Sequence, residues 1–398
     1  MSVSQTIISR YNTTMESLER GITTILPTKE GLQSLLNSDK TLNIYLGIDP
    51  TATRIHLGHA VALRKLQSFV EMGHNVTFLI GDFTALIGDT SDKDTERPVL
   101  TSEEIQQNFA TYKEQASKII DFTQVSVKFN SEWLSTLRFS EIVKLCQHFS
   151  VGDFVGRELI KNRLQEGKKV GLHETLYPVM QGYDSYYMDT DVQIGGSDQT
   201  FNMLAGRTLQ KDLRNKETFV VCVEYLLGTD GRKMSKSWGN AIWLTDEPHD
   251  MYGKVMSLKD ELIESYLVLA TSLPLDEVRA LVKQLEEGAN PMDIKKKLAW
   301  QIVKELYDET EASKAEMHFT QSFQESAPDF SQVVEVEEGA TLLQAVSSLV
   351  GSNSEAKRLI VANAVDVNGE VVTDSKRAVM RDDKIKVGKR TFATIKIK

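Results

Sequence analysis

TLNIYLGIDPTATRIHLGHAVALRKLQSFVEMGHNVTFLIG, residues 41–81, is the stretch of this 398-residue sequence that decides its fold. Residues 41–48 are apolar and β-branched, which predicts a buried strand, and Pro50 then marks a turn. A helical pattern covers residues 57–72, and NVTFLIG at 75–81 predicts a second strand. A strand, a helix and a strand in this order predict two parallel strands joined by a helical crossover.

Strand and helix patterns keep alternating up to about residue 245. We expect strands at 191–196 and 218–226, and helices at 102–119, 140–165, 174–188 and 198–215. This order predicts an α/β fold with a Rossmann-like, doubly wound parallel sheet in residues 41–245, after an N-terminal helical segment at 1–40. Ligands bind such sheets at the carboxyl ends of the strands.

The C-terminal part of the chain follows other patterns. Residues 246–325 read as successive helices, which predicts an α-helical domain, and a polar stretch with Pro328 predicts a linker. Residues 332–398 predict a small α+β module, in which Asn368 and Gly369 lie between VDV and EVV as in a β-hairpin. The net charge of the whole chain is −10, yet residues 351–398 contain eleven Lys and Arg against six Asp and Glu. We expect a polyanion to bind at this end, although a solvated basic tail has the same composition.

Composition excludes several classes of protein. No apolar run reaches the roughly 20 residues that a membrane-spanning helix needs, and the N-terminal residues lack the pattern of a secretory signal. The two cysteines, Cys146 and Cys222, are too far apart in sequence for a short-spaced zinc or redox motif. We expect both to be reduced, buried and structural in a cytoplasmic protein with no membrane partner.

His-Leu-Gly-His at residues 56–59 lies where the first crossover helix should begin. A helix N-terminus offers unpaired N–H groups and positive partial charge, which suit a phosphate. His56 and His59 are three residues apart and share one face, from which each can donate to phosphate or ribose oxygens. Gly58 has no side chain, so an adenine ring could lie against the backbone. By itself this short pattern fits a turn with two incidental histidines equally well.

A second motif, GTDGRKMSKSWGN at 228–240, follows the predicted strand at 218–226. Lys233 and Lys236 flank small residues in a glycine-containing loop. Such a loop can close so that its ammonium groups stabilise the charge of a departing pyrophosphate. Two lysines alone would indicate only a solvated loop, but both motifs lie at strand ends about 175 residues apart.

Together, His-Leu-Gly-His and Lys-Met-Ser-Lys-Ser resemble the signature pair of the class I aminoacyl-tRNA synthetases. This resemblance implies ATP as a substrate with Mg²⁺, and no tightly bound metal with protein ligands. It also implies an activation step without a general base, in which an amino-acid carboxylate attacks the α-phosphorus. Catalysis would then consist of positioning and of charge stabilisation by His56, His59, Lys233 and Lys236.

Further segments resemble the tyrosyl enzymes of this class, whose activated tyrosine passes to the 3′ end of the tRNA for tyrosine. They are Tyr45 before the first turn, YPVMQGYD at 177–184 and QIGGSDQ at 193–199. In the second segment Tyr177, Gln181 and Asp184 fall on one stripe of a helix. The resemblance implies that Tyr45 and Asp184 hold the phenol hydroxyl of tyrosine.

The resemblance also implies roles for other residues. The α-ammonium group of tyrosine would bind Asp89, Tyr177 and Gln181, and its carboxylate would lie near Gln193 and Gln199. Asp198 would accept a hydrogen bond from the ribose. The residues expected around the ribose and phosphates are Gly47, Asp49, Thr51, His56, Gly58, His59, Gly196 and Lys236. GDTSDKDTER at 88–97 resembles a mobile loop that grips pyrophosphate through Lys93 and Arg97, and a charged surface loop is the alternative.

Partners follow from the same resemblance. Residues 332–398 resemble an RNA-binding module first seen in a ribosomal protein, which implies that they bind tRNA together with an anticodon-binding domain at 246–325. A stabilising accessory module is the alternative. HFSVGDFVGREL at 148–159 resembles a dimer-forming segment, within an insertion near 130–170, and implies a homodimer. The apolar residues of this segment could equally be core; they are Phe149, Val151, Phe154 and Val155.

Three other functions remain open at this point. A tryptophanyl enzyme would share the fold and both signature motifs, but Tyr45, Asp184 and the C-terminal module argue against it. Another nucleotidyl transferase would share the histidine motif, but not the lysine loop. An RNA-binding protein without catalysis would not need the intact histidines and lysines. Amino-acid-dependent exchange of pyrophosphate into ATP distinguishes all three from a tyrosyl enzyme.

Overall fold

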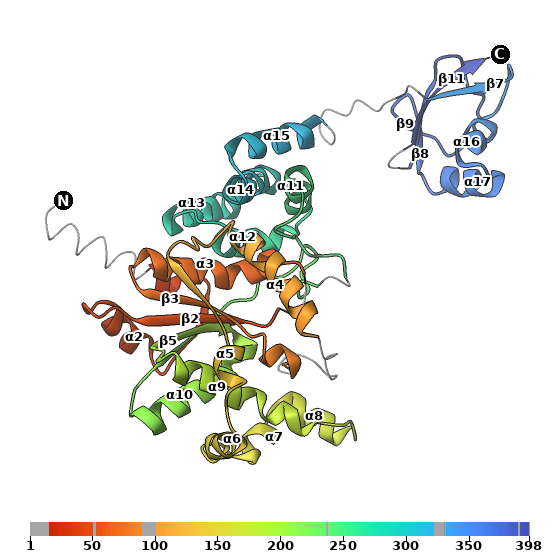
Figure 1. Cartoon of the computed structure of the whole chain (residues 1–398). Coiled ribbons are helices and arrows are strands. Elements are labelled where there is room, and N and C mark those ends of the chain that lie inside the picture. Colours follow the sequence, from red (N-terminus) through yellow and green to blue (C-terminus); the bar gives the residue numbers. More distant parts are fainter. Residues whose placement is uncertain are drawn as a thin grey trace, which may run out of the picture. The chain divides into compact units, whose positions relative to one another are not determined.

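The computed structural model describes residues 16–50, 53–89, 101–235, 238–321, 330, 332–388 and 391–397 (Figure 1). The chain divides into two compact units, Met1–Met317 and His318–Lys398, and each is described by itself. Some of the predicted site residues lie outside the described residues, namely Thr51, Lys93, Arg97 and Lys236.

A six-stranded sheet, ordered β1-β6-β5-β2-β3-β4, forms the centre of the described part of the first unit (Figure 1). Its parallel strands are β2 (Asn43–Ile48), β3 (Asn75–Ile80), β4 (Val125–Phe129), β5 (Val192–Gly196) and β6 (Phe219–Val223). β1 (Ile22–Leu26) adds an antiparallel edge beside β6. The predicted doubly wound α/β fold is confirmed. The chain winds in opposite directions from β2, so a crevice opens at the carboxyl ends of β2 and β5.

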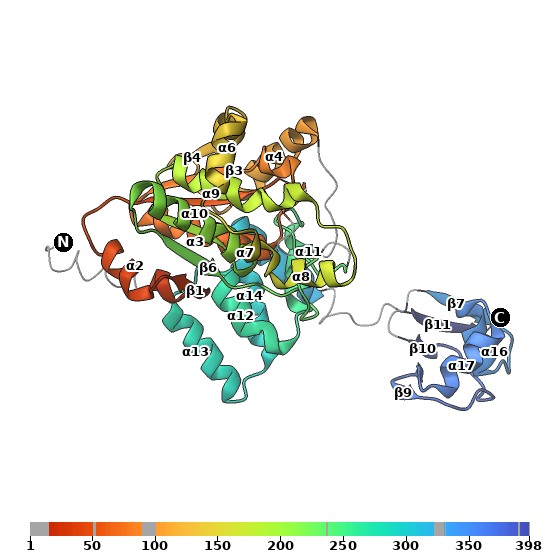
Figure 2. The same cartoon turned by 90° about the horizontal axis from the view of Figure 1, so that it is seen from below.

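Helices cover both faces of this sheet (Figures 1 and 2). α3 (Leu57–Glu71) packs on β2, β3 and β5, with α4 (Ser102–Ala116) on the same side. α9 (Tyr177–Tyr187) and α10 (Thr200–Arg214) pack against each other on the opposite side. A Cβ atom on Gly182 would lie 3.0 Å from the backbone carbon of Ala205, so glycine allows α9 and α10 to approach closely. Because both faces are covered, a strand such as β6 is buried at every residue.

The connection between β4 and α9 consists of short helices, whereas one helical stretch was predicted at 140–165. These helices are α5 (Ser131–Leu134), α6 (Phe139–Cys146), α7 (Val151–Val155), α8 (Glu158–Gln165) and the 3₁₀ helix η2 (Leu172–Thr175). Ser150 begins a new helix inside the predicted one, because its hydroxyl accepts a hydrogen bond from the Gly152 N–H (3.1 Å). A buried ion pair between Arg163 and Glu174 (2.7 Å) connects α8 to η2.

The described part of residues 246–325 is helical, as the pattern predicted. It contains α11 (Pro248–Met256), α12 (Ile263–Ala270), α13 (Leu275–Glu286), α14 (Pro291–Leu306) and α15 (Glu309–Phe319). Up to Met317 these helices belong to the same compact unit as the sheet. α12 packs on α3, and Arg64 of α3 pairs with Glu305 of α14 (2.6 Å). The helices therefore extend the layer above the sheet, whereas a separate domain was predicted.

Some elements were not predicted, namely β1, β4 and α2 (Lys29–Leu36). β1 occupies residues that the predicted N-terminal helical segment included. Each of the two missed strands has five residues, and β1 (ITTIL) is an edge strand without a continuous apolar face. Runs of this length are too short for periodicity to distinguish strand from helix or loop.

The second unit is the expected α+β module. Its elements are β7 (Val333–Val336), α16 (Leu342–Val350), α17 (Asn353–Val361), β8 (Val365–Val367), β9 (Glu370–Val371), β10 (Lys384–Val387) and β11 (Thr391–Ile397). The strands form a sheet in the order β7-β11-β10-β8-β9 over a separate core that includes Leu342, Ile360 and Ile385. Asn368 and Gly369 have φ of 55° and 91°, as a two-residue hairpin turn requires. The predicted hairpin is confirmed.

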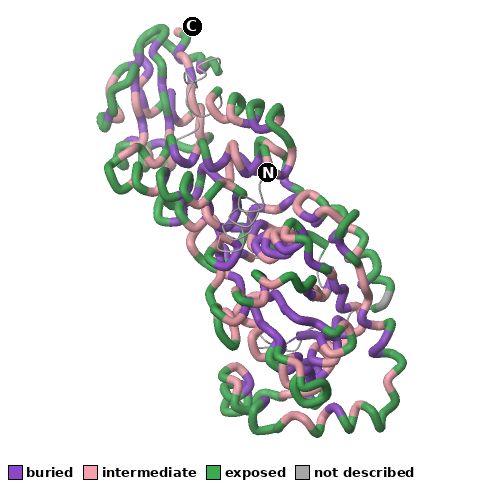
Figure 3. The backbone as a smooth tube through the Cα atoms, turned by 90° about the vertical axis from the view of Figure 1, so that its left-hand side faces the viewer, coloured by how far each residue is buried: buried purple, intermediate pink, exposed green. Residues whose placement is uncertain are grey.

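The buried residues lie mainly in the cores of the two units (Figure 3). Cys222 is buried in β6, whereas Cys146 is half-buried, so the expectation of burial holds for Cys222 alone; both are free thiols. Among the described residues, no helix is both long enough and apolar enough to cross a bilayer.

Candidate active site

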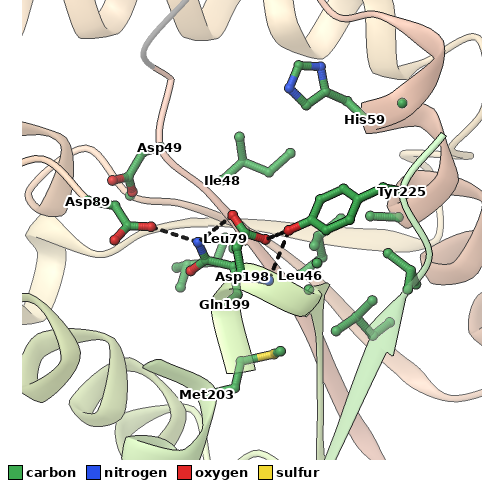
Figure 4. A pocket seen from close by; sticks show the side chains of 18 of the residues that line it. Leu46, Ile48, Asp49, His59, Leu79, Asp89, Asp198, Gln199, Met203 and Tyr225 are labelled. Carbon is green, nitrogen blue, oxygen red and sulfur yellow. Dashed lines mark hydrogen bonds between the residues drawn. The ribbon is translucent and has the colours of Figure 1, made fainter. Parts of the chain in front are cut away.

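A cavity of about 600 Å³ opens at the carboxyl ends of β2 and β5, where the strand order predicts a ligand site (Figure 4). It brings together residues from distant parts of the sequence. The predicted site residues that line it are Tyr45, Gly47, Asp49, His56, Gly58, His59, Asp89, Tyr177, Gln181, Asp184, Gly196, Asp198, Gln199 and Lys233.

Tyr45 on β2 and Gln193 on β5 are register partners at the inner end of this cavity. The Tyr45 hydroxyl donates to Gln193 Oε1 (3.0 Å), and Gln193 Nε2 donates to the Met203 carbonyl (2.9 Å). A Cβ atom on Gly206 would lie 2.7 Å from Gln193 Oε1, so glycine in α10 makes room for this amide. Gln193 is fully buried and supports Tyr45. The resemblance implied that Gln193 lies near the carboxylate of tyrosine, whereas the structure places its side chain behind Tyr45, outside the cavity lining.

Asp184 lies on α9 at the same inner end. Trp133 Nε1 donates to Asp184 Oδ1 (2.7 Å), and Asn130 Nδ2 donates to Asp184 Oδ2 (3.1 Å). Burial raises the pKa of Asp184 to about 8, although both donors lower it. Burial, and secondly the negative charge of Asp184, raise the pKa of the Tyr45 hydroxyl. Tyr45 and Asp184 thus line the same end of the cavity.

Asn130 and Trp133 are functional residues that the sequence analysis missed. They follow β4 directly, so their position at the carboxyl end of a parallel strand was the available signal. β4 itself was not predicted, and the signal was lost with it. Asn130 also donates to the Thr84 hydroxyl (3.0 Å), which connects the end of β3 to the same network.

Acidic side chains occupy the middle of the cavity. The Tyr177 hydroxyl donates to Asp49 Oδ2 (2.8 Å), and the Thr84 hydroxyl donates to Asp49 Oδ1 (2.8 Å). Asp89 is buried and accepts a hydrogen bond from Gln199 Nε2 (2.6 Å; Figure 4). These carboxylates give the middle of the cavity a negative field that favours an ammonium group.

Gly81 is a further residue that sequence reasoning did not single out. It follows β3, and a Cβ atom there would lie 2.0 Å from Asp49 Oδ1 and 2.4 Å from the Thr84 hydroxyl. Only glycine leaves room for the hydrogen bond between Asp49 and Thr84.

His56 and His59 lie at the N-terminus of α3, at the outer end of the cavity. Their rings stack with centroids 3.8 Å apart, and the His56 N–H donates to His59 Nδ1 (3.3 Å). This contact leaves the proton of a neutral His59 on Nε2, where it can be donated to a ligand. Burial, followed by the neighbouring His59 and Lys233, lowers the pKa of His56 to about 3. Enclosure by the cavity wall and the Lys233 ammonium also lower the pKa of His59, although its side chain is exposed to the open cavity. Both rings are therefore neutral hydrogen-bond donors near pH 7.

The loop that carries Lys233 is held by Asn240, a buried side chain that the sequence analysis did not single out. Asn240 Nδ2 donates to the Lys233 carbonyl (3.2 Å) and to Asp230 Oδ1 (2.8 Å), and Asn240 Oδ1 accepts from the Ser235 N–H (2.9 Å). Lys233 reaches the cavity, whereas Lys236 lies outside the described residues. In the part of the chain that the structure describes, no three His, Cys, Asp or Glu side chains are grouped so as to hold a metal ion.

Comparison with known proteins agrees with this geometry. The family described as tRNA synthetases class I (W and Y) matches residues 37–324. Tyrosine–tRNA ligase 2 of Vibrio cholerae is 42% identical over 389 residues, which are 96% of this chain and 98% of that protein. Tyrosine–tRNA ligase of Haemophilus influenzae is 40% identical over 393 residues, with 97% of each chain covered.

Solved structures show the same fold. A truncated mitochondrial tyrosyl-tRNA synthetase from Aspergillus nidulans superposes with a TM-score of 0.66 at 23% identity, over 81% of this chain and all of that one. The Archaeoglobus fulgidus tyrosyl-tRNA synthetase complexed with L-tyrosine gives a TM-score of 0.61 at 20% identity, over 77% and 99% of the two chains. The sequence matches, the fold and the cavity thus agree, and the chain belongs to the class I aminoacyl-tRNA synthetases, in the family of bacterial-type tyrosyl-tRNA synthetases.

Proposed function

We propose that this cavity activates L-tyrosine with ATP and that the chain then transfers tyrosine to the 3′ end of the tRNA for tyrosine, as a tyrosine–tRNA ligase. One observation carries the proposal. Tyr45 and Asp184, both buried, line the inner end of a cavity whose outer end is the N-terminus of α3. The inner end suits an aromatic hydroxyl, and the outer end suits phosphate.

The phenol hydroxyl of tyrosine would lie between Tyr45 and Asp184. It can donate to the Asp184 carboxylate and hydrogen-bond the Tyr45 hydroxyl, which Gln193 holds in place. Phenylalanine would leave both side chains buried without this partner, which costs free energy. Asp89, Tyr177 and Gln181, which line the middle of the cavity, would bind the α-ammonium group.

ATP, which we propose enters with Mg²⁺ on its phosphates, would occupy the outer end. Gly47, Gly58 and Gly196 line this region without side chains. Asp198, and Asp49 from the adjoining middle of the cavity, would supply carboxylates for the sugar. A carboxylate oxygen of tyrosine attacks the α-phosphorus; the bond to the leaving pyrophosphate breaks and tyrosyl-adenylate forms. Neutral His56 and His59 donate hydrogen bonds from their ring N–H groups to the phosphates, and Lys233 stabilises the charge that develops on pyrophosphate.

The remaining predicted site residues lie outside the described part of the chain, and their roles here are proposed from the sequence. Lys236 would act with Lys233, Thr51 would contact a phosphate, and Lys93 and Arg97 would grip pyrophosphate. Transfer then follows when a ribose hydroxyl at the tRNA 3′ end attacks the tyrosyl carbonyl and AMP leaves. Gln199, which hydrogen-bonds Asp89, would lie near that carbonyl.

Partners extend the proposal to the rest of the chain. The basic module at 332–398, with the helices of 246–325, would bind the tRNA. A homodimer would form through the insertion near 130–170, where Phe139 is 81% exposed and Val151 is 73% exposed; Leu172, just after it, is 81% exposed. Of the segment at 148–159, Phe154 is buried core, so it would not take part. We propose that this enzyme works in the cytoplasm.

The test is exchange of labelled pyrophosphate into ATP with the full chain, one amino acid at a time. We expect exchange with tyrosine and magnesium, and at least a hundredfold less with phenylalanine or tryptophan, because a buried polar pair is then unmatched. Exchange with tryptophan in place of tyrosine would refute the specificity. Exchange without transfer to any tRNA would refute the second step alone.

A further inference from the structure

Tyr225 lines the cavity just beyond the end of β6 and makes two hydrogen bonds to one residue (Figure 4). Its hydroxyl donates to Asp198 Oδ1 and accepts from the Asp198 backbone N–H (2.9 Å). Hydrogen bonds to a carboxylate are about twice as strong as those between neutral groups. The phenol therefore fixes both the backbone and the side chain of Asp198.

This arrangement determines which oxygen of Asp198 faces a ligand. Oδ1 is occupied by Tyr225, whereas the contact described for Oδ2 is long, 3.4 Å to Gln199 Nε2. A Cβ atom on Gly196 would lie 2.5 Å from Asp198 Oδ1 and 3.4 Å from the Tyr225 hydroxyl. The glycine thus provides the space in which the phenol and the carboxylate meet, and Oδ2 keeps the capacity to accept a further hydrogen bond.

The ring of Tyr225 has a second contact. Lys233 Nζ lies 5.6 Å from its centroid, within the range of a cation–π attraction. Tyr225 is 46% exposed, so its ring forms part of the cavity surface and does not belong to the core. One side chain thus connects Asp198, just beyond the end of β5, with the loop that carries Lys233.

We infer that Tyr225 is a positioning residue for ATP: its hydroxyl orients the Asp198 carboxylate toward a ribose hydroxyl, and its ring holds Lys233 over the cavity. This inference rests on the proposed role of Asp198. It adds a residue that neither signature motif contains, because Tyr225 lies three residues before GTDGRKMSKSWGN. The carboxylate is oriented before ATP arrives, so less conformational freedom is lost when ATP binds.

The first test is Tyr225→Phe in pyrophosphate exchange by the full chain. Loss of one hydrogen bond to a carboxylate should raise the KM for ATP about five- to tenfold. The KM for tyrosine and kcat should change by less than about twofold, since the ring and the inner end of the cavity are intact. Tyr186→Phe is the matched control, because it removes a phenol hydroxyl from α9 outside the cavity lining. An unchanged or lower KM for ATP, or an equal rise for both substrates, overturns the inference.

The second test combines Tyr225→Phe with Asp198→Asn and with deoxy-ATP. In the Asp198→Asn background Tyr225→Phe should have almost no further effect on the KM for ATP. In the single variant, the penalty for removing the 2′- or 3′-hydroxyl of ATP, whichever is larger in the unaltered enzyme, should shrink. Additive effects overturn the inference while leaving the role of Asp198 intact. If Asp198→Asn alone leaves the KM for ATP unchanged, the proposed role of Asp198 fails, and the inference fails with it.

A third variant isolates the ring. Tyr225→Leu removes the cation–π contact as well as the hydroxyl, so kcat should fall about threefold below that of Tyr225→Phe. Equal kcat values for the two variants would limit the role of Tyr225 to its hydroxyl and refute the part of the inference that concerns Lys233.

Discussion

The two ends of the cavity are built differently. At the inner end, Tyr45, Asp184 and Gln193 are buried, and each is hydrogen-bonded to other parts of the protein. At the outer end, Asp198 is half-buried, Tyr225 is nearly half exposed, and glycines form much of the wall. The inner end is thus arranged before its ligand arrives, whereas the outer end is open to solvent.

The difference matches what each end has to do. Discrimination between similar aromatic side chains requires buried polar groups that an unsuitable ligand leaves unpaired. A nucleotide site must admit ATP and release pyrophosphate, so its charges act across an open cavity and from a loop. Changes at the inner end should therefore affect tyrosine selectively, and changes at the outer end should affect ATP or the chemical step.

The largest effect should come from Asp184→Ala. It removes the proposed phenol acceptor, takes from the buried Trp133 N–H the acceptor described for it, and leaves the Asn130 amide with the Thr84 hydroxyl as its remaining acceptor. We expect kcat/KM for tyrosine to fall about 10³-fold, with the KM for ATP changed less than about threefold. Asp212→Ala, at an exposed carboxylate, is the control. Equal losses for both substrates would show that the two ends are not independent.

Lys233→Ala tests the outer end. The ammonium group is proposed to act on the departing pyrophosphate, so its loss should lower kcat about 10²-fold. The KM for tyrosine should remain within about twofold, because Lys233 lies at the outer end of the cavity, near His56. Lys283→Ala, on the exposed side of α13, should leave both parameters unchanged. A comparable rise in the KM for tyrosine would mean that Lys233 has a structural role.

A smaller effect is expected from Trp133→Phe, which keeps an aromatic ring and removes the donor to Asp184 (2.7 Å). Asp184 would be less well oriented, and its pKa would rise further because one donor to its ionised form is lost. We expect kcat/KM for tyrosine to fall about tenfold. Trp300→Phe, in α14, serves as the control. No change with Trp133→Phe would mean that Asn130 alone fixes the carboxylate.

Local patterns were sufficient for most of the fold, and the resemblance to tyrosyl enzymes supplied most of the residues expected in the cavity. The βαβ unit at 41–81 gives the direction of the sheet, and strand ends converge at one edge. The pattern alone placed His56 at that edge, whereas the resemblance to tyrosyl enzymes predicted that Tyr45 and Asp184 act together. The motif residues are also those whose chemistry can be read from their type, such as a lysine in a glycine-containing loop.

The residues that were missed act through neighbours that are distant in sequence. Trp133 and Asn130 matter only because α9 brings Asp184 beside them, and their strand was too short to detect. In the sequence, Tyr225 is only an aromatic residue near the end of a predicted strand. Its role depends on the hydrogen bond from its hydroxyl to Asp198. Gln193 was assigned to the ligand, although its partner is Tyr45 across a register pair. Such contacts depend on how elements pack against one another, and the periodicity of the sequence predicts single elements only.

The smallest expected effect concerns pH at the outer end. An ordinary histidine has a pKa of about 6.5 and would gain a proton between pH 8 and pH 6. The pKa of His56 is lowered to about 3 and that of His59 is also lowered, so both rings should stay neutral throughout this range. We expect kcat/KM for ATP, measured with saturating tyrosine and corrected for the protonation of ATP itself, to vary by less than about twofold from pH 8 to pH 6.

Saturating tyrosine matters because burial raises the pKa of Asp184 to about 8, so the binding of tyrosine can titrate in the same range. With the inner end occupied, any remaining pH dependence comes from the outer end, from ATP itself or from the loop lysine. ATP gains a proton near pH 6.5, so the control is the same profile for His59→Asn. A loss of activity toward pH 6 that His59→Asn abolishes would mean that His59 titrates as an ordinary histidine. The outer end would then lose activity to a proton that the cavity does not exclude, and the contrast between the two ends would lie in exposure alone.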